Sequence, residues 1–165
     1  MPGLPLDPIA EARRLWAAHG WRDAADGMAA VTSLMRAHQI VLARVEAALK
    51  PHGVTFARYE VLMLLYFSRK GSLPMSIIGE RLQVHPTSVT NAVDRLEAAG
   101  LVRRVPHPDD RRATVVELLD RGRELADAAT HDLNATVFAE PGISRREAGT
   151  LIDVLTEMRR DAGDF

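Results

Sequence analysis

The amino-acid sequence predicts a mainly α-helical fold with one small β-hairpin. From Met28 to Leu49 apolar residues recur at alternating steps of three and four, which is the period of a helix with one apolar face. Two aliphatic or β-branched runs, Leu101-Val102 and Thr114–Leu118, flank PHPDDRRA, whose prolines and aspartates favour a turn. The 165 residues, 47% of them hydrophobic, suffice for one compact domain.

Composition excludes several classes of protein. A net charge of −1 excludes a uniformly basic nucleic-acid coat but allows a local basic patch. The absence of cysteine excludes disulfides, zinc–thiolate sites and thiol redox switches. The N-terminus lacks the basic start and apolar core of a signal peptide, and no apolar run approaches the roughly 18 residues of a membrane span. We therefore expect a cytoplasmic protein without a membrane partner.

The ends of the chain are expected to form helices with apolar faces. Residues 7–18 and about 23–50 predict two helices, and residues 120–138 and 144–161 predict two more. Ser144 and Glu147 have the spacing of a capping box. The second helix carries a heptad-like seam that suits another helix, made of Met28, Val31, Met35, His38, Leu42, Val45 and Leu49. On the last helix Leu151, Leu155 and Met158 share a face, which Ile152 and Val154 flank.

The middle of the chain contains the most informative helix. A buried helix over 55–71 with Thr55 as its N-cap, and a short one over 75–82, precede it. Pro86 suits its first position, and an apolar stripe of Val89, Val93 and Leu96 points inward. Its other face carries hydroxyls, an amide and Arg95. Because Ser, Thr and Asn are mediocre helix formers, this face indicates DNA contact rather than a plain solvated surface.

The hairpin adds arginines directly after that helix. Arg111 and Arg112 occupy the tip, and Arg103 and Arg104 lie on the approaching strand. A solvated surface hairpin with Asp109 and Asp110 nearby is the plainer interpretation. Following a helix pair, however, a basic hairpin is typical of a winged helix-turn-helix, in which the wing contacts the minor groove or the DNA backbone.

The run from Thr55 to Gly122 resembles the MarR family (multiple antibiotic resistance regulators). The matching segments are FARYEVLMLL, VHPTSVTNAVDRLEAAGLVRR and PHPDDRRATVVEL, the last carrying the family's D-x-R pattern at 110–112. The resemblance implies a homodimeric bacterial regulator, often a repressor, that binds a palindromic operator in double-stranded DNA and releases it on binding a small ligand. Such a protein is associated with the nucleoid when bound to DNA. Leu118-Leu119 departs from the family's usual Leu-Thr, so the start of the next helix lacks its threonine cap.

The resemblance also implies roles for individual residues. Arg112 takes the position of the wing arginine, and Asp110 that of the aspartate which braces it. Arg95 is left open between a DNA contact and a buttress, and Arg111 is a further wing contact. The groove-facing positions are Thr87, Ser88, Thr90 and Asn91.

The expected domain organisation is a single domain over 1–165. Residues 1–54 form an N-terminal extension and dimerisation helix, 55–119 the winged core, and 120–165 the C-terminal dimerisation helices. The terminal helices offer more apolar surface than the core can cover, although packing within one chain takes part of it. A dimer is favoured because two recognition helices must reach half-sites about one DNA turn apart.

The effector is expected to be a small aromatic or lipophilic anion, by resemblance. The candidate lining residues are Trp16, His38, Arg58 and Tyr59. Three of them have plainer roles: burial for Trp16, a core or interface histidine for His38, and an ion pair with Glu60 for Arg58. The six histidines are scattered without ligand spacing, so no metal or other cofactor is expected, with a metal sensor as an alternative.

Two other classes of function compete with a DNA-binding regulator. An enzyme would need a nucleophile–base pair, a metal cluster or a phosphate-binding loop, and none is legible, so we expect no enzymatic activity. A winged-helix module for protein–protein interaction is the second alternative. The small polar face of the central helix argues against it, because protein interfaces favour large aromatic anchors.

Overall fold

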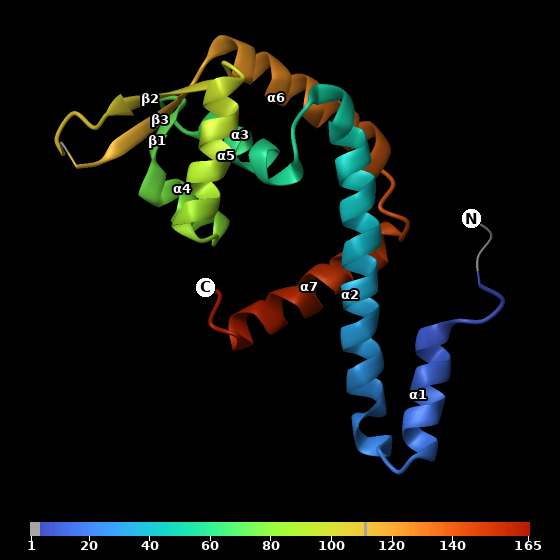
Figure 1. Cartoon of the computed structure of the whole chain (residues 1–165). Helices are drawn as coiled ribbons and strands as arrows, with labels where there is room; N and C mark the ends of the chain where they lie inside the picture. Colours follow the sequence, from blue (N-terminus) through green and yellow to red (C-terminus); the bar gives the residue numbers. More distant parts are fainter. Residues whose placement is uncertain (1–3, 111) are drawn as a thin grey trace. The chain divides into compact units, whose positions relative to one another are not determined.

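The computed structural model describes residues 4–110 and 112–165 (Figure 1). The chain divides into two compact units, one up to Ala47 and one from Ala48 to Phe165. Within the described residues, no helix combines the length and the apolarity needed to cross a bilayer.

The first unit is a helical hairpin. Helix α1 (Pro8–Ala18) begins at Asp7, whose Oδ1 accepts a hydrogen bond from the Ile9 N–H at 2.9 Å. Helix α2 (Arg22–Leu49) follows a tight turn and extends into the second unit. Two contacts hold the hairpin: an ion pair of 2.7 Å between Arg13 and Asp26, and an edge-to-face contact of Trp16 and Trp21 with ring centroids 5.0 Å apart.

The second unit is a winged helix-turn-helix followed by further helices. A three-residue turn, η1 (Lys50–His52), opens the unit, and a π-helical turn, η2 (Asn134–Phe138), follows its penultimate helix. The other elements are α3 (Phe56–Phe67), β1 (Ser72–Pro74), α4 (Met75–Leu82), α5 (Pro86–Ala98), β2 (Val102–Pro106), β3 (Thr114–Leu118), α6 (Asp120–Leu133) and α7 (Arg145–Asp161).

The core of this unit lies between α3, α4, α5, α6 and the sheet. Its fully buried side chains include Leu62, Leu65, Ile78, Leu96 and Leu133. The inward stripe predicted for α5 is confirmed, since Val89, Val93 and Leu96 are all buried. Burial of these aliphatic side chains, at about 25 cal/mol per Å² of apolar surface, fixes the orientation of α5 on the core.

The sheet has three antiparallel strands in the order β1-β3-β2, one more than the predicted hairpin. Ser72 pairs with Glu117, and Pro74 pairs with Val115. Three residues are too few to show the alternation by which a strand is recognised. Strand β1 exists because it pairs with β3, and it places α4 directly at the edge of the sheet.

Helix α6 approaches the rest of the core very closely at Gly122. A Cβ built on Gly122 would lie 2.1 Å from the carbonyl oxygen of Leu101 and 2.8 Å from Cδ1 of Leu118. Further along, the Tyr59 hydroxyl lies 2.9 Å from Oγ1 of Thr130. A glycine at 122 therefore permits the packing that seats α6 on the winged core.

Helix boundaries differ from the predicted ones where the cap chemistry was ambiguous. Helix α3 ends at Phe67 rather than 71, because Ser68 is extended and Gly71 has a φ of 65°. At the start of α7, Ser144 and Glu147 form the predicted capping box. The lost threonine cap is also confirmed, since Leu119 precedes α6 without a side-chain capping bond.

Candidate nucleic-acid interface

Helix α5 is presented by a tight turn after α4. Gln83 ends α4 in the left-handed region, with a φ of 53°, and turns the chain toward α5. His85 then caps α5, its Nδ1 accepting a hydrogen bond from the Thr87 N–H at 3.2 Å. Pro86 occupies the first helical position, where no N–H is required. The chain thereby forms the helix-turn-helix geometry, with the start of α5 exposed.

The small polar side chains of α5 lie together on its exposed face. Thr90 donates its hydroxyl to the carbonyl of Pro86 at 3.1 Å, so this hydroxyl is partly engaged within the helix. Side chains this short let a helix approach base edges closely. The exposed candidates for DNA contact on α5 are Thr87, Ser88, Thr90, Asn91 and Arg95.

The turn of the wing is shaped by Asp110. Its Oδ1 accepts a hydrogen bond from the main-chain N–H of Arg112 at 2.9 Å, and the Ala113 N–H donates to the Asp110 carbonyl at 3.0 Å. Asp110 thus contacts the backbone of Arg112, while the Arg112 side chain is exposed. The candidate Arg111 lies outside the described residues.

Arg104 joins the wing to α5, a role that sequence reasoning missed. Its guanidinium pairs with Asp94 and with Glu97, each at 2.5 Å, and its N–H donates to Glu97 at 2.7 Å. The backbone N–H of Arg104, followed by its guanidinium, lowers the pKa of Glu97 below its ordinary value. The signal in the sequence is the pair of acidic residues, Asp94 and Glu97, three apart on a helix whose exposed face is otherwise small and polar.

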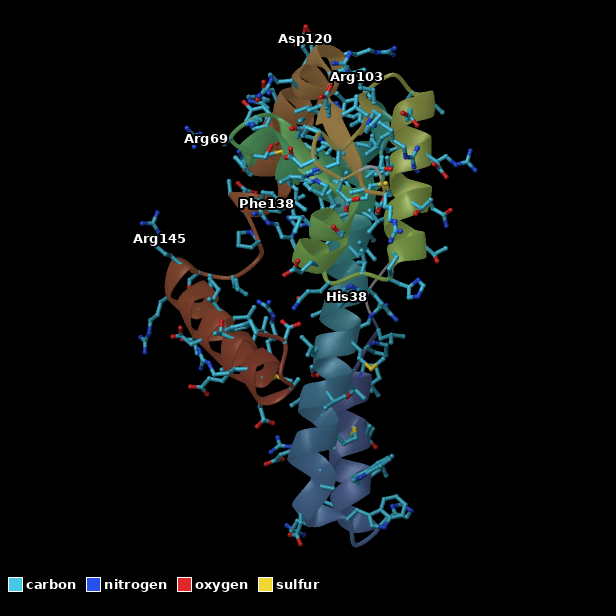
Figure 2. The ribbon with its side chains drawn as sticks, turned by 90° about the vertical axis from the view of Figure 1, so that its left-hand side faces the viewer. His38, Arg69, Arg103, Asp120, Phe138 and Arg145 are labelled. Carbon is cyan, nitrogen blue, oxygen red and sulfur yellow. The ribbon has the colours of Figure 1, made fainter. Side chains whose placement is uncertain are left out.

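The other strand arginine, Arg103, is paired as well. Its Nε lies 2.6 Å from Oε2 of Glu117, its partner in the β2–β3 register. Figure 2 labels Arg103 among the side chains of this part of the unit. Both arginines on the approaching strand are therefore held by carboxylates of the same chain, whereas Arg112 at the turn is exposed.

The four candidates for an effector pocket fall in different environments. In the first unit, Trp16 is half-buried on α1 and His38 is exposed on α2 (Figure 2). In the second unit, Tyr59 is buried and its hydroxyl lies against Thr130. Arg58 donates from Nε to Oγ1 of Thr55 at 3.2 Å. Arg58 is brought together with Ser88, Asn91 and Arg95 of α5, all of which line one hollow.

Acidic and imidazole side chains are dispersed in the structure. Within residues 4–110 and 112–165, no three His, Cys, Asp or Glu side chains gather as metal ligands would. The partly buried contact of His52 with Asp132, at 2.8 Å, joins η1 to α6. The concentration of exposed small polar and basic side chains on α5 and the wing is thus the feature of the second unit that suits nucleic acid.

Known proteins share this architecture. Residues 52–113 match the model of the MarR family. The chain is 53% identical to Sco5413 of Streptomyces coelicolor, a MarR family transcriptional regulator whose crystal structure covers 85% of this chain and 97% of its own, with a TM-score of 0.78. The uncharacterized HTH-type transcriptional regulator YdgJ of Bacillus subtilis is 30% identical over 114 residues, 68% of each protein.

A third relative has been solved with a ligand. CouR from Rhodococcus jostii RHA1, bound to p-coumaroyl-CoA, is 28% identical and has a TM-score of 0.66, covering 76% of this chain and 87% of its own. Together with the helix-turn-helix geometry of α4 and α5 and the paired wing, these likenesses identify the fold and the class of activity. The chain belongs to the MarR family of DNA-binding transcriptional regulators.

Proposed function

We propose that the protein is a homodimeric repressor that binds a palindromic operator and leaves it on binding a small aromatic or lipophilic anion. The observation that carries the proposal is the exposed face of α5, where short polar side chains stand beside a wing with an exposed arginine. In this proposal residues 55–119 contact DNA, while 1–54 and 120–165 form the dimer.

Sequence is read by the start of α5 in the major groove. An asparagine amide can pair in a bidentate fashion with adenine, which makes Asn91 the side chain with the most specific chemistry on this face. Thr87, Ser88 and Thr90 add hydroxyl and methyl contacts at close range. Arg112, with Arg111, places positive charge along the minor groove or backbone beside the wing, and such contacts contribute affinity more than specificity.

Two helices supply the apolar surface for dimerisation. On α2, the side chains of Val31, Met35 and Val41 are exposed. On α7, none of whose residues is buried, the exposed apolar side chains are Leu151, Ile152, Val154 and Met158. A two-fold symmetric dimer presents two copies of α5, so its operator is palindromic. A dimer seated on such a site excludes other proteins from the same DNA, which is why we infer repression.

The effector is inferred from the relatives and from the composition. CouR is bound to p-coumaroyl-CoA, an anionic aromatic compound, in its solved structure. The present chain has no cysteine, so oxidation of a thiol cannot be its signal. Trp16 and His38 remain the proposed effector contacts in the first unit, and Tyr59 with Arg58 in the second. Regulation of transcription places the protein in the cytoplasm, on the nucleoid when bound to DNA.

DNA binding is tested by fluorescence anisotropy with the DNA upstream of the protein's own gene. We expect salt-sensitive, sequence-specific binding, because phosphate contacts release counterions. Asn91→Ala weakens specific binding at least about tenfold and leaves non-specific binding nearly unchanged. Asn134→Ala, at an exposed asparagine outside α5, is the matched control. Wild-type protein that binds no DNA fragment specifically would contradict the proposal and favour a protein–protein module.

The effector is tested by thermal-shift screening with aromatic carboxylates, followed by release of the operator. A ligand of the native state raises the unfolding temperature, and an inducer also lowers the affinity for DNA. Compounds that raise the temperature without releasing DNA, or a full screen without any shift, would remove the induction step while leaving DNA binding intact.

A further inference from the structure

A hollow of about 690 Å³ lies between the start of α3 and the exposed face of α5. About three turns of α5 form one wall, and the first turn of α3 forms the other. Its polar lining comes from Thr55, Arg58, Ser88, Asn91, Asp94 and Arg95. The two arginines are 37 positions apart in the sequence, and the packing of α3 against α5 brings them to one site.

The positive charges in this hollow are not neutralised within the chain. Arg58 donates its Nε–H to the neutral hydroxyl of Thr55. Arg95 is exposed, and across residues 4–110 and 112–165 neither of these two arginines lies within ion-pairing distance of a carboxylate. Arg103 and Arg104, by contrast, each contact a carboxylate at 2.5–2.6 Å. The arginines of the hollow are thus available to an external anion.

The nearest negative charge belongs to Asp94, which also lines the hollow. Its Oδ1 is paired with Arg104 at 2.5 Å, so its charge is largely offset from outside the hollow. The start of α3 adds the positive end of a 12-residue helix. Thr55 forms no side-chain capping bond there, because its hydroxyl accepts from Arg58 instead. The net field in the hollow therefore favours an oxyanion.

We propose that this arginine hollow binds a backbone phosphate of the operator, directly beside the groove-facing residues. The proposal rests on the proposed function, since it assumes that α5 enters the major groove. A helix in that groove is flanked by the sugar–phosphate walls, and the hollow opens on the flank of α5. Guanidinium groups match the geometry of phosphate oxygens, and the Ser88 hydroxyl adds a neutral donor.

The same chemistry would accept a free phosphate or a carboxylate. A small anion in the hollow would then compete directly with the DNA backbone for Arg58 and Arg95. The two sources of the oxyanion are separable, because only a DNA phosphate occupies a fixed position in the operator sequence.

The first test compares the salt dependence of DNA binding between variants. The double variant Arg58→Gln/Arg95→Gln should bind specific and non-specific DNA about tenfold more weakly. The slope of log K against log salt concentration should fall in magnitude by about 0.9, the value of one phosphate. Arg145→Gln is the matched control, because Arg145 projects into solvent at the start of α7 (Figure 2). An unchanged slope in the double variant would overturn the proposal.

The second test locates the phosphate. Each phosphate of an operator duplex is replaced in turn by a neutral methylphosphonate. At one position per half-site, wild-type protein should lose about tenfold in affinity, while the double variant loses nothing further. If wild-type and double variant respond identically at every position, the hollow does not hold a DNA phosphate. The first and second tests leave the reading of bases by Asn91 untouched, so their failure is distinct from failure of DNA binding itself.

A third measurement identifies a small-anion site. NMR of the arginine Nε–H signals is followed while inorganic phosphate or benzoate is added without DNA. The proposal is supported if the free anion binds Arg58 and Arg95 with millimolar affinity or weaker and one methylphosphonate position weakens the binding of wild-type protein but not of the double variant. If the free anion binds with micromolar affinity and wild-type and double variant respond identically to every methylphosphonate, the hollow is a site for a soluble anion and the proposal is overturned.

Discussion

The winged core and the helices that flank it use similar apolar patterns in opposite ways. In the core, the aliphatic side chains of α4 and α5 are covered by the same chain, as Ile78 and Val93 illustrate. On α2, residues 30–43 are exposed throughout, although Leu34, Met35 and Val41 are spaced like core positions. Helix α7 buries none of its residues. Helical periodicity alone therefore does not distinguish an apolar face that is buried in the core from one that is exposed.

The difference separates two kinds of stability. The winged core obtains its free energy of folding from burial within one chain, which is independent of concentration. The exposed faces of α2 and α7 gain burial only when something else covers them, so their stability depends on association. Substitutions in the two regions should have correspondingly different consequences.

The largest effect is expected for a charge on the apolar face of α7. Leu151→Glu should weaken the proposed dimer at least about a hundredfold, because the substitution occurs twice in a two-fold interface and each lost leucine removes roughly 1.5–3 kcal/mol of burial. Analytical ultracentrifugation measures the loss. Gly149→Glu, about 200° around the helix, is the control and should remain dimeric. A Leu151→Glu protein of unchanged assembly would place dimerisation elsewhere.

A substitution in the core should lower the free energy of unfolding and leave the oligomeric state of the folded protein unchanged. Gly122→Ala forces a methyl group against the Leu101 carbonyl and should cost about 1–3 kcal/mol of unfolding free energy, measured in urea. Gly149→Ala is the matched control, since nothing lies within 4 Å of its Cβ position. The control should gain up to about 1 kcal/mol, because alanine favours a helix more than glycine does. Equal stability of the two variants would refute the close approach of α6.

The smallest effect is expected at the partly exposed ion pairs between the wing and α5. Arg104→Met removes the ion pairs with Asp94 and Glu97 and should cost about 1 kcal/mol at pH 7, since both carboxylates are partly exposed. The pKa of Glu97 is lowered in the folded state, so its contribution is present above the unfolded value and is lost as the pH falls through the folded one.

Urea unfolding from pH 7 down to pH 3 checks this prediction. The stability of wild-type protein should converge on that of Arg104→Met as Glu97 becomes protonated. A difference that stays constant over this range would mean that Arg104 stabilises the wing by packing of its aliphatic stem alone.

Much of the fold could be predicted because its signals are local. The inward stripe of α5, Pro86 at its start and the capping box of Ser144 all depend on residues within one or two turns. Strand β1 could not be predicted, since its three residues become a strand only by pairing with β3. The π-helical turn after Leu133 likewise has no local signal that we recognise.

The candidate site was predictable in its residue types but not in its pairings. The exposed polar face of α5 follows from periodicity. That Arg104 is held by carboxylates while Arg95 is not depends on how β2 crosses α5 in space. The neighbourhood of Arg58 and Arg95 similarly arises from the contact of α3 with α5, which no spacing in the sequence encodes.

Because Arg104 is attached to α5 mainly through two acidic side chains, the two halves of that helix tolerate substitution differently. The side chains of Asp94 and Glu97 in its second half, together with the Thr90 carbonyl at 3.4 Å, hold the helix to the wing and set its orientation. Its first half carries Thr87, Ser88 and Asn91, whose side chains take no part in that attachment. In the proposed mode of DNA binding, changes at these three positions redirect the protein to new operators, in evolution or by selection from a randomised pool, while the scaffold that aims the helix is left unaltered.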